Sequence, residues 1–141
     1  MELLTRHLEL STQGRTEIVD ITGEVQRLLR ESGFTEGGAT IFAVGSTVGV
    51  TTMEFEPGLA KEDLPAAFNE IAPPGRPYAH HATWGDDNGS SHVRASLLGC
   101  SLVVPFLGAR LLLGQWQQIV FIDFDTRPRR RRIVVQFSGM R

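Results

Sequence analysis

The chain has 141 residues, a length that predicts one domain over residues 1–141 with a core that needs no disulfide staples. Hydrophobic residues make up 41% and charged residues 21%, and the formal net charge of −2 excludes a global attraction to nucleic acid or to an anionic membrane. Cys100 is the single cysteine, so an internal disulfide is impossible and we expect a cytoplasmic protein. No apolar run approaches the ~20 residues of a membrane span, and we expect no signal peptide.

The first half of the chain shows strand-like alternation interrupted by two helical patterns. Alternation and β-branched residues predict strands over residues 2–11, 16–21, 39–44 and 47–55. Thr22 can cap a helix that ends at Gly33, since three apolar residues follow it at helical spacing. A second amphipathic helix is expected over residues 61–71, and two prolines stop it.

The second half begins with a polar loop over residues 76–89 and continues with a short helix, capped by Ser90 or Ser91, that runs to Leu98. Strands separated by short turns then predict an antiparallel meander over residues 101–106, 110–113, 118–124 and 131–137. The fold class is therefore mainly β with short helices (α+β), an antiparallel β-sandwich with helices at its margins.

Three of the four histidines lie within a segment of thirteen residues, in and just after the polar loop, and carboxylates and a glycine accompany them. Imidazoles and carboxylates beside a rigid sheet are the groups that a metal site or an acid–base site requires. His80 and His92 flank a turn, so both rings can point into one cavity. Two solvent-exposed loop histidines remain the alternative, because their spacing fits no named zinc pattern.

Several motifs of the chain resemble those of the YjbQ-like family, also described as secondary thiamine-phosphate synthase. The resemblance rests on Ser-Leu-Leu-Gly-Cys-Ser-Leu-Val-Val-Pro-Phe at 96–106, Leu-Leu-Leu-Gly-Gln-Trp-Gln-Gln-Ile at 111–119, Gly-Ser-Thr-Val-Gly-Val-Thr-Thr-Met-Glu at 45–54, Tyr-Ala-His at 78–80 and Ser-His-Val-Arg-Ala at 91–95. The similarity implies a β-sandwich that assembles as a homotrimer, a histidine- and glutamate-containing pocket that sometimes holds a metal, and a weak thiamine-phosphate synthase activity. That reaction joins a pyrimidine pyrophosphate to a thiazole phosphate and releases pyrophosphate.

The sequence departs from the family pattern at three positions. Gly45 stands where many members carry histidine, Met53 where many carry asparagine, and Gln115 where threonine is usual. The first departure removes a potential ligand or base, so the family's chemistry does not transfer whole. A variant with its own ligand is the alternative that this difference opens.

Two sets of residues are the candidate site. The expected catalytic residues, which are also the expected ligands of a divalent metal (zinc or magnesium), are His80, His92 and Glu54. The expected substrate-binding residues are Ser46, Thr47, Asp86, Asn88, Arg94 and Gln117. Plainer interpretations of four of these residues stay open. Glu54 can be a solvated glutamate at a strand edge, Asp86 and Asn88 can be ordinary turn residues before Gly89, and Gln117 can have a purely structural role.

Three functional classes follow from these residues. The first is a low-rate thiamine-phosphate synthase-type transferase acting on small phosphorylated molecules. The second is a non-catalytic ligand- or metal-binding trimer, which the missing histidine at Gly45 favours. The third is a metal-dependent hydrolase of a small phosphate ester. The arginines at 127 and 129–132 suggest nucleic-acid binding, but no stacking aromatic residues accompany them, so we expect a solvated hairpin and no nucleic-acid or membrane partner.

Overall fold

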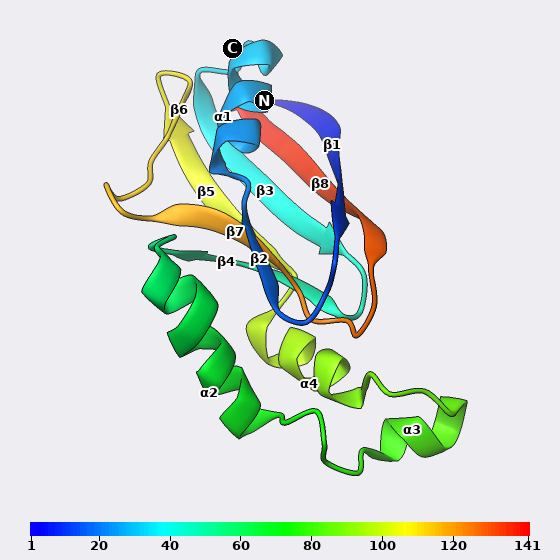
Figure 1. Ribbon diagram of the computed structural model, residues 1–141. Coiled ribbons are helices and arrows are strands. Elements are labelled where there is room, and N and C mark those ends of the chain that lie inside the picture. Colours follow the sequence, from blue (N-terminus) through cyan, green and yellow to red (C-terminus); the bar gives the residue numbers. More distant parts are fainter.

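Two antiparallel sheets form most of the structure, a computed structural model that describes residues 1–141 (Figure 1). The larger sheet has the order β1 (Glu2–Thr12), β8 (Arg129–Met140), β3 (Glu36–Val44), β5 (Ser101–Leu107) and β6 (Arg110–Leu111). The smaller sheet has the order β2 (Glu17–Asp20), β7 (Gln118–Asp123) and β4 (Val48–Met53). The predicted fold class, mainly β with short helices and antiparallel sheets, is confirmed.

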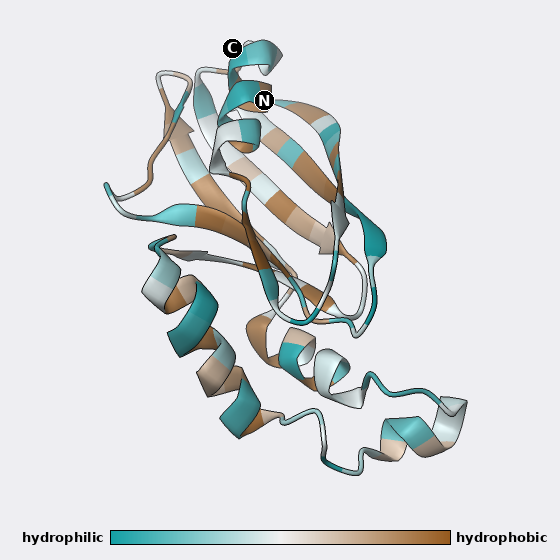
Figure 2. Cartoon of the chain, viewed as in Figure 1, coloured by the Kyte–Doolittle hydropathy of each residue, from teal (hydrophilic) through white to brown (hydrophobic).

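The main core lies between the two sheets. Strand β8 sits between β1 and β3 and alternates fully buried Ile133, Val135 and Phe137 with partly exposed residues. Hydrophobic and hydrophilic residues also interchange along the strands in Figure 2. The ring of Phe137 lies 6.1 Å from that of Phe106 and 6.4 Å from that of Phe34, measured between centroids. Each such fully buried ring stabilises the fold by about 1.5–3 kcal/mol relative to an exposed one.

The predicted meander over the last strands is wrong in its pairing. β5 and β6 do pair, over two residue pairs, but β7 pairs with β2 and β4 while β8 pairs with β1 and β3. The short turn at 125–128 therefore carries the chain from one sheet to the other. The turn at 13–15 and the segment at 45–47 do the same. Alternation identifies the buried face of each strand, but it does not identify the strand's neighbour.

Helix α1 (Thr22–Ser32) closes one end of the core with Val25 and Leu29, and it ends at Gly33, whose φ of 77° is left-handed as predicted. The predicted cap at Thr22 is wrong, because the N-cap is Ile21 and makes no side-chain cap hydrogen bond. The Thr22 hydroxyl instead donates to Asp20 Oδ1 at 2.7 Å and accepts the N–H of Ile119 at 2.8 Å. It thereby fastens the helix start to β7.

Three further helices lie below the smaller sheet in Figure 1: α2 (Leu64–Ile71), which follows the π-helical turn η1 (Leu59–Asp63), α3 (Ala79–Trp84) and α4 (Gly89–Leu98). Phe68 of α2 and Ala95 of α4 pack on Val120 and Ile122 of β7, so this strand is buried on both faces. None of the helices combines the length and apolar character that a membrane span requires.

Two local predictions in this region are corrected. The segment expected to be a loop over 76–89 contains α3, a six-residue helix that ends at Gly85 with a φ of 68°. Such a short helix shows little periodicity in sequence. The N-cap of α4 is Asn88 rather than Ser90 or Ser91, and the hydroxyl of Ser91 donates to the carbonyl of Phe124, at the end of β7.

Candidate functional site

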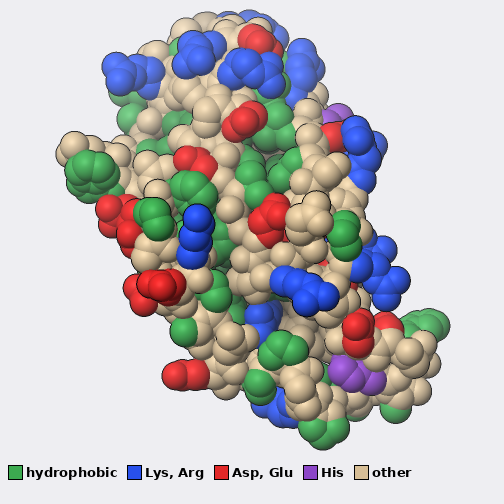
Figure 3. Space-filling view, in the orientation of Figure 1, with side chains coloured by type: hydrophobic (Ala, Val, Ile, Leu, Met, Phe, Trp, Pro, Cys, Tyr) green, Lys and Arg blue, Asp and Glu red, His purple; other side chains and the backbone are tan.

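Helices α3 and α4 bring two of the predicted histidines together. The rings of His80 on α3 and His92 on α4 stand with centroids 4.3 Å apart at an interplanar angle of 50°. Nε2 of His80 lies 3.2 Å from Oδ2 of Asp86 and 3.2 Å from Oδ1 of Asn88. Figure 3 shows histidine beside acidic side chains at the lower right, below the strands. The expected convergence of the two imidazoles therefore occurs.

The Asn88 amide links His80 to two carboxylates. In one orientation Nδ2 of Asn88 donates to Asp125 Oδ1 at 3.3 Å, and Oδ1 faces His80 Nε2, which must then carry a proton. In the opposite orientation Nδ2 donates to His80 Nε2 and to Asp86, each at 3.2 Å. In either orientation Asn88 lies against Nε2 of His80 and reaches a neighbouring carboxylate.

His92 is held toward its neutral form. Burial lowers its pKa from the ordinary value, and the neighbouring His80 adds to this effect. The carboxylates of Asp125 and Asp86 and the backbone of Ser46 act in the opposite direction but do not cancel the shift. A neutral imidazole near pH 7 is a proton acceptor.

His81 contributes position rather than chemistry to this cluster. Its Nε2 accepts the N–H of Gly89 at 2.9 Å, and its ring lies 5.5 Å from the ring of Tyr78. These contacts fasten the start of α4 to α3, so they set the separation of His80 and His92.

Glu54 and Gln117 lie away from the histidines. Ser46, next to His92, precedes β4, whereas exposed Glu54 follows the other end of this strand, a span of about 20 Å. Gln117 also lies at that far end, where its Nε2 donates to Thr52 Oγ1 at 2.9 Å. The His–His–Glu cluster expected from sequence is therefore not formed within one chain, because alternation places Glu54 on a face without giving its distance along the strand.

The donor set of one chain does not fit a metal centre. Nowhere in residues 1–141 do three or more His, Cys, Asp or Glu side chains form a group that could hold a metal ion. The two imidazoles supply two nitrogen ligands, and Asp86 is engaged as a hydrogen-bond acceptor. A catalytic zinc site takes three protein ligands, so we derive no step through a metal held by this chain.

Thr47 belongs to a buried polar network at the corner between the sheets. Its hydroxyl donates to Asp125 Oδ2 at 3.1 Å and accepts from Arg131 Nη2 at 2.9 Å. Arg131 also binds Asp123 through two hydrogen bonds, of 2.7 and 3.0 Å, and Asp123 is fully buried. The Thr47 hydroxyl is thus occupied by protein groups, and the network holds the β7–β8 corner.

Asp125 is a site residue that the sequence places only in the turn between the expected strands over 118–124 and 131–137. Burial disfavours its charge, but hydrogen bonds from Thr126, Asn88 and Thr47 and the charge of Arg129 outweigh burial and lower its pKa. The available signal was the pair Asp123 and Asp125 at the end of a buried apolar strand, where ionised groups require partners.

Ser46 lies in a shallow cavity of about 280 Å³ beside His92, together with Gly45 and Cys100. Glycine at position 45 has a φ of 152°, and an added Cβ there would lie 3.1 Å from Val48 Cγ2. The departure from the family's histidine thus leaves one wall of this cavity without a side chain.

Arg94 is buried on the opposite side of α4 from this cavity. Its guanidinium donates to the carbonyl of Ala72, to Thr16 Oγ1 at 2.8 Å and to Asn69 Oδ1 at 2.9 Å. It therefore ties α2 and the segment just before β2 to α4, and it also borders a second cavity, of about 430 Å³.

The sequence and the fold of this chain have close counterparts among known proteins. The family model described as UPF0047 protein YjbQ-like matches residues 6–140. A UPF0047 protein of Methanothermobacter thermautotrophicus is 38% identical, covering 99% of this chain and 94% of its own length, and YugU of Bacillus subtilis is 34% identical, covering 96% and 100%. A hypothetical protein of Aeropyrum pernix K1 has a solved structure that aligns with a TM-score of 0.89 at 33% identity over 99% of both chains.

The solved YbjQ-like protein of unknown function from Sulfolobus solfataricus P2 aligns with a TM-score of 0.86 at 30% identity, covering 98% of this chain and 99% of that one. The class that the fold defines is a sandwich of antiparallel sheets with a helical layer against the smaller sheet. The chain belongs to the YjbQ-like UPF0047 family.

Proposed function

We propose that the chain is an acid–base enzyme for small phosphorylated molecules, in which His80 and His92 carry the proton. The observation that carries this proposal is the 4.3 Å separation of the two rings, one of which is biased toward the neutral state. Asp86 and Asn88 each place a polar atom 3.2 Å from Nε2 of His80, so they orient this ring for proton transfer.

The reaction that we assign to this site is the condensation of a pyrimidine pyrophosphate with a thiazole phosphate. The carbon–oxygen bond to pyrophosphate breaks, the thiazole nitrogen forms a new bond to that carbon, and thiamine phosphate and pyrophosphate leave. A protonated imidazole of the pair gives its proton to the departing pyrophosphate, which raises the rate of the bond-breaking step. Ser46 offers a hydroxyl in the cavity beside His92. Magnesium enters only as a complex with the pyrophosphate substrate.

The test is the formation of thiamine phosphate from the two substrates and magnesium. We expect a low rate that falls by about 10²–10⁴-fold in a His80→Gln/His92→Gln variant, the range that general acid–base groups contribute. His7→Gln is the matched control, because His7 is exposed on β1. A double variant as active as the native protein would refute the role of the pair. If the native protein makes no product but hydrolyses phosphate esters in a histidine-dependent manner, the hydrolase alternative replaces the transferase.

We also propose a homotrimer, as the family resemblance implies. The outer face of β3 and β5 exposes apolar side chains that an isolated chain would leave in water, namely Phe42, Val44, Val103 and Leu107. Contact with a second copy would cover this surface. Light scattering coupled to size-exclusion chromatography should give three times the chain mass of 15.5 kDa, and Val103→Glu should lower it. A monomer at every concentration would contradict the proposal.

A further inference from the structure

The guanidinium of Arg94 is a buried cation without an acidic partner. Arg94 is 6% exposed, and its hydrogen-bond acceptors are a carbonyl, a hydroxyl and an amide, all neutral. No carboxylate lies within ion-pair distance of it, whereas Arg131, which is similarly buried, is paired with two aspartates. Burial lowers the pKa of Arg94, the sign of an uncompensated charge. Buried charges are ordinarily paired, so this one calls for an anion.

Ser90, one helical turn before Arg94 on α4, is also without a partner. It is 4% exposed, and neither its backbone N–H nor its hydroxyl makes a hydrogen bond within the protein. Every side-chain oxygen that is fully enclosed in the protein has a hydrogen-bond partner. Because the Ser90 hydroxyl has none, it is not fully enclosed, and it opens onto the cavity that Ser90 lines. A free N–H and a free O–H at the start of a ten-residue helix favour an anion.

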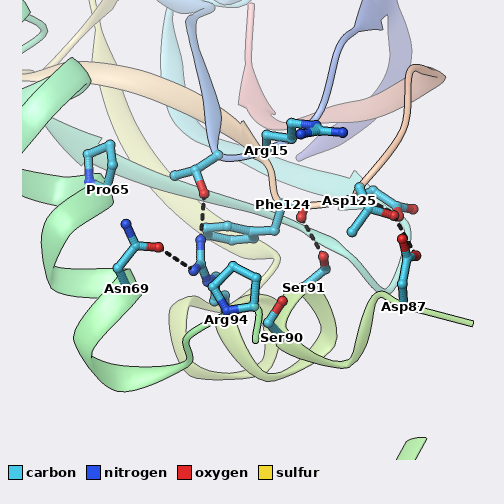
Figure 4. A pocket seen from close by; sticks show the side chains of 12 residues that line it. Arg15, Pro65, Asn69, Asp87, Ser90, Ser91, Arg94, Phe124 and Asp125 are labelled. Carbon is cyan, nitrogen blue, oxygen red and sulfur yellow. Dashed lines mark hydrogen bonds between the residues drawn. The ribbon is translucent and has the colours of Figure 1, made fainter. Parts of the chain in front are cut away.

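Both residues face the same cavity of about 430 Å³, which lies between α2, α4 and the turns that follow β1 and β7. Figure 4 shows Ser90 and Arg94 side by side and Arg15 on the other side of the space. The Arg15 side chain makes no hydrogen bond or ion pair within the protein, so a second cation is available there.

Two carboxylates border the same space, and neither removes its positive character. Asp125 is paired with Arg129 and Arg131, and Asp87 accepts the hydroxyl of Thr126 at 2.9 Å at the rim. The arginines balance the charge of Asp125, whereas the hydroxyl of Thr126 leaves the charge of Asp87 unbalanced, so Arg94 and Arg15 exceed the unpaired carboxylates of the cavity by one positive charge.

We propose that this cavity binds the phosphate group of a small phosphorylated molecule, held by the N–H and hydroxyl of Ser90 and by Arg94 and Arg15. The donors are those that recognise phosphate oxygens, and the volume leaves room for the remainder of a small molecule. This site lies on the other side of α4 from the cavity beside His92, and it does not depend on the function proposed for the histidines.

The test is isothermal titration with inorganic phosphate and pyrophosphate, with acetate at equal ionic strength as the carboxylate arm. Arg94 also holds the end of α2, so the informative variants are Ser90→Ala and Arg15→Asn, which break no hydrogen bond of the folded chain. Asparagine suits the φ of 59° at position 15. The control is Arg110→Asn, which removes one exposed positive charge from β6, outside the cavity.

We expect phosphate or pyrophosphate to bind more tightly than acetate, Ser90→Ala and Arg15→Asn each to weaken binding about tenfold, and Arg110→Asn to leave it unchanged. The His80→Gln/His92→Gln variant should bind phosphate as the native protein does, which separates this proposal from the enzymatic one. Phosphate binding no tighter than acetate binding would overturn it. So would equal phosphate affinity in the native protein and in both cavity variants.

Discussion

Replacing Arg131 by methionine should destabilise the fold strongly, because it leaves a buried carboxylate without its cation. Asp123 is 0% exposed and accepts two hydrogen bonds from Arg131, at 2.7 and 3.0 Å. Its other donors, the Thr12 hydroxyl and the Asp125 N–H, carry no charge. Breaking a buried pair in this way costs about 3–5 kcal/mol, against a total stability of about 5–15 kcal/mol. For a chain of this size the melting temperature should fall by roughly 6–20 °C.

Urea unfolding followed by far-ultraviolet circular dichroism is the appropriate assay. Tryptophan fluorescence would be a poor probe, because Trp84 and Trp116 are 73% and 65% exposed in the folded state. The matched control is Arg130→Met, which removes the neighbouring arginine, whose pair with Glu9 is exposed; its unfolding curve should stay close to that of the native protein.

A second substitution distinguishes the stability lost with the ion pair from the stability lost with the packing of the arginine side chain. Adding Asp123→Asn to Arg131→Met removes the uncompensated charge, so the double variant should recover part of the stability that the single one loses. A loss below about 1 kcal/mol for Arg131→Met would refute the reasoning, since it would mean that water reaches Asp123 or that the carboxylate is not ionised.

Two other perturbations test the site and the sheet. Burial and His80 lower the pKa of His92 in the folded protein, so as the pH falls the unfolded chain takes up a proton at this residue before the folded chain does. The free energy of unfolding should therefore decrease as the pH drops below about 6.5. His92→Gln should flatten that part of a pH series of urea midpoints, and curves of equal slope would contradict the shift. Gly139→Ala should destabilise by more than about 1 kcal/mol, since its Cβ would lie 2.0 Å from the carbonyl oxygen of Glu36. Gly23→Ala, with nothing within 4 Å, should stabilise α1 by up to about 1 kcal/mol; equal midpoints for the two alanine variants would show that the clash is relieved.

Most of the strands and the longer helices could be predicted because they have one buried face. The apolar residues of β8 and α1 recur at intervals of two and of three or four, and this periodicity marks the face that packs. Pairing could not be predicted in the same way, because both sheets bury their inner faces against one core. A strand such as β7, buried on both sides, carries no alternation from which to choose its layer.

The candidate site was predicted in part for a similar reason. His80 and His92 are close in sequence and joined by a turn, so local geometry was enough to expect them together. Glu54 is distant in sequence, and its position depends on the length and direction of β4, which alternation does not contain. That Arg94 has no acidic partner is a property of the tertiary structure, because it depends on which groups of α2 and of the segment before β2 surround the guanidinium.

The order of strands in the larger sheet also constrains how this chain folds. Strand β8, which lies between β1 and β3, follows every other strand in chain order, whereas β1 and β3 lie in the first third of the chain. Until residues 129–140 emerge, one edge of each neighbour has no hydrogen-bonding partner, and closing the β1–β8 pair joins positions more than a hundred residues apart. This sheet can therefore be completed only once residues 129–140 are available, and its long-range pairing makes folding slow for a domain of this size. A nascent chain that stalls before β8 leaves the edges of β1 and β3 that β8 would pair exposed to chaperones and to aggregation.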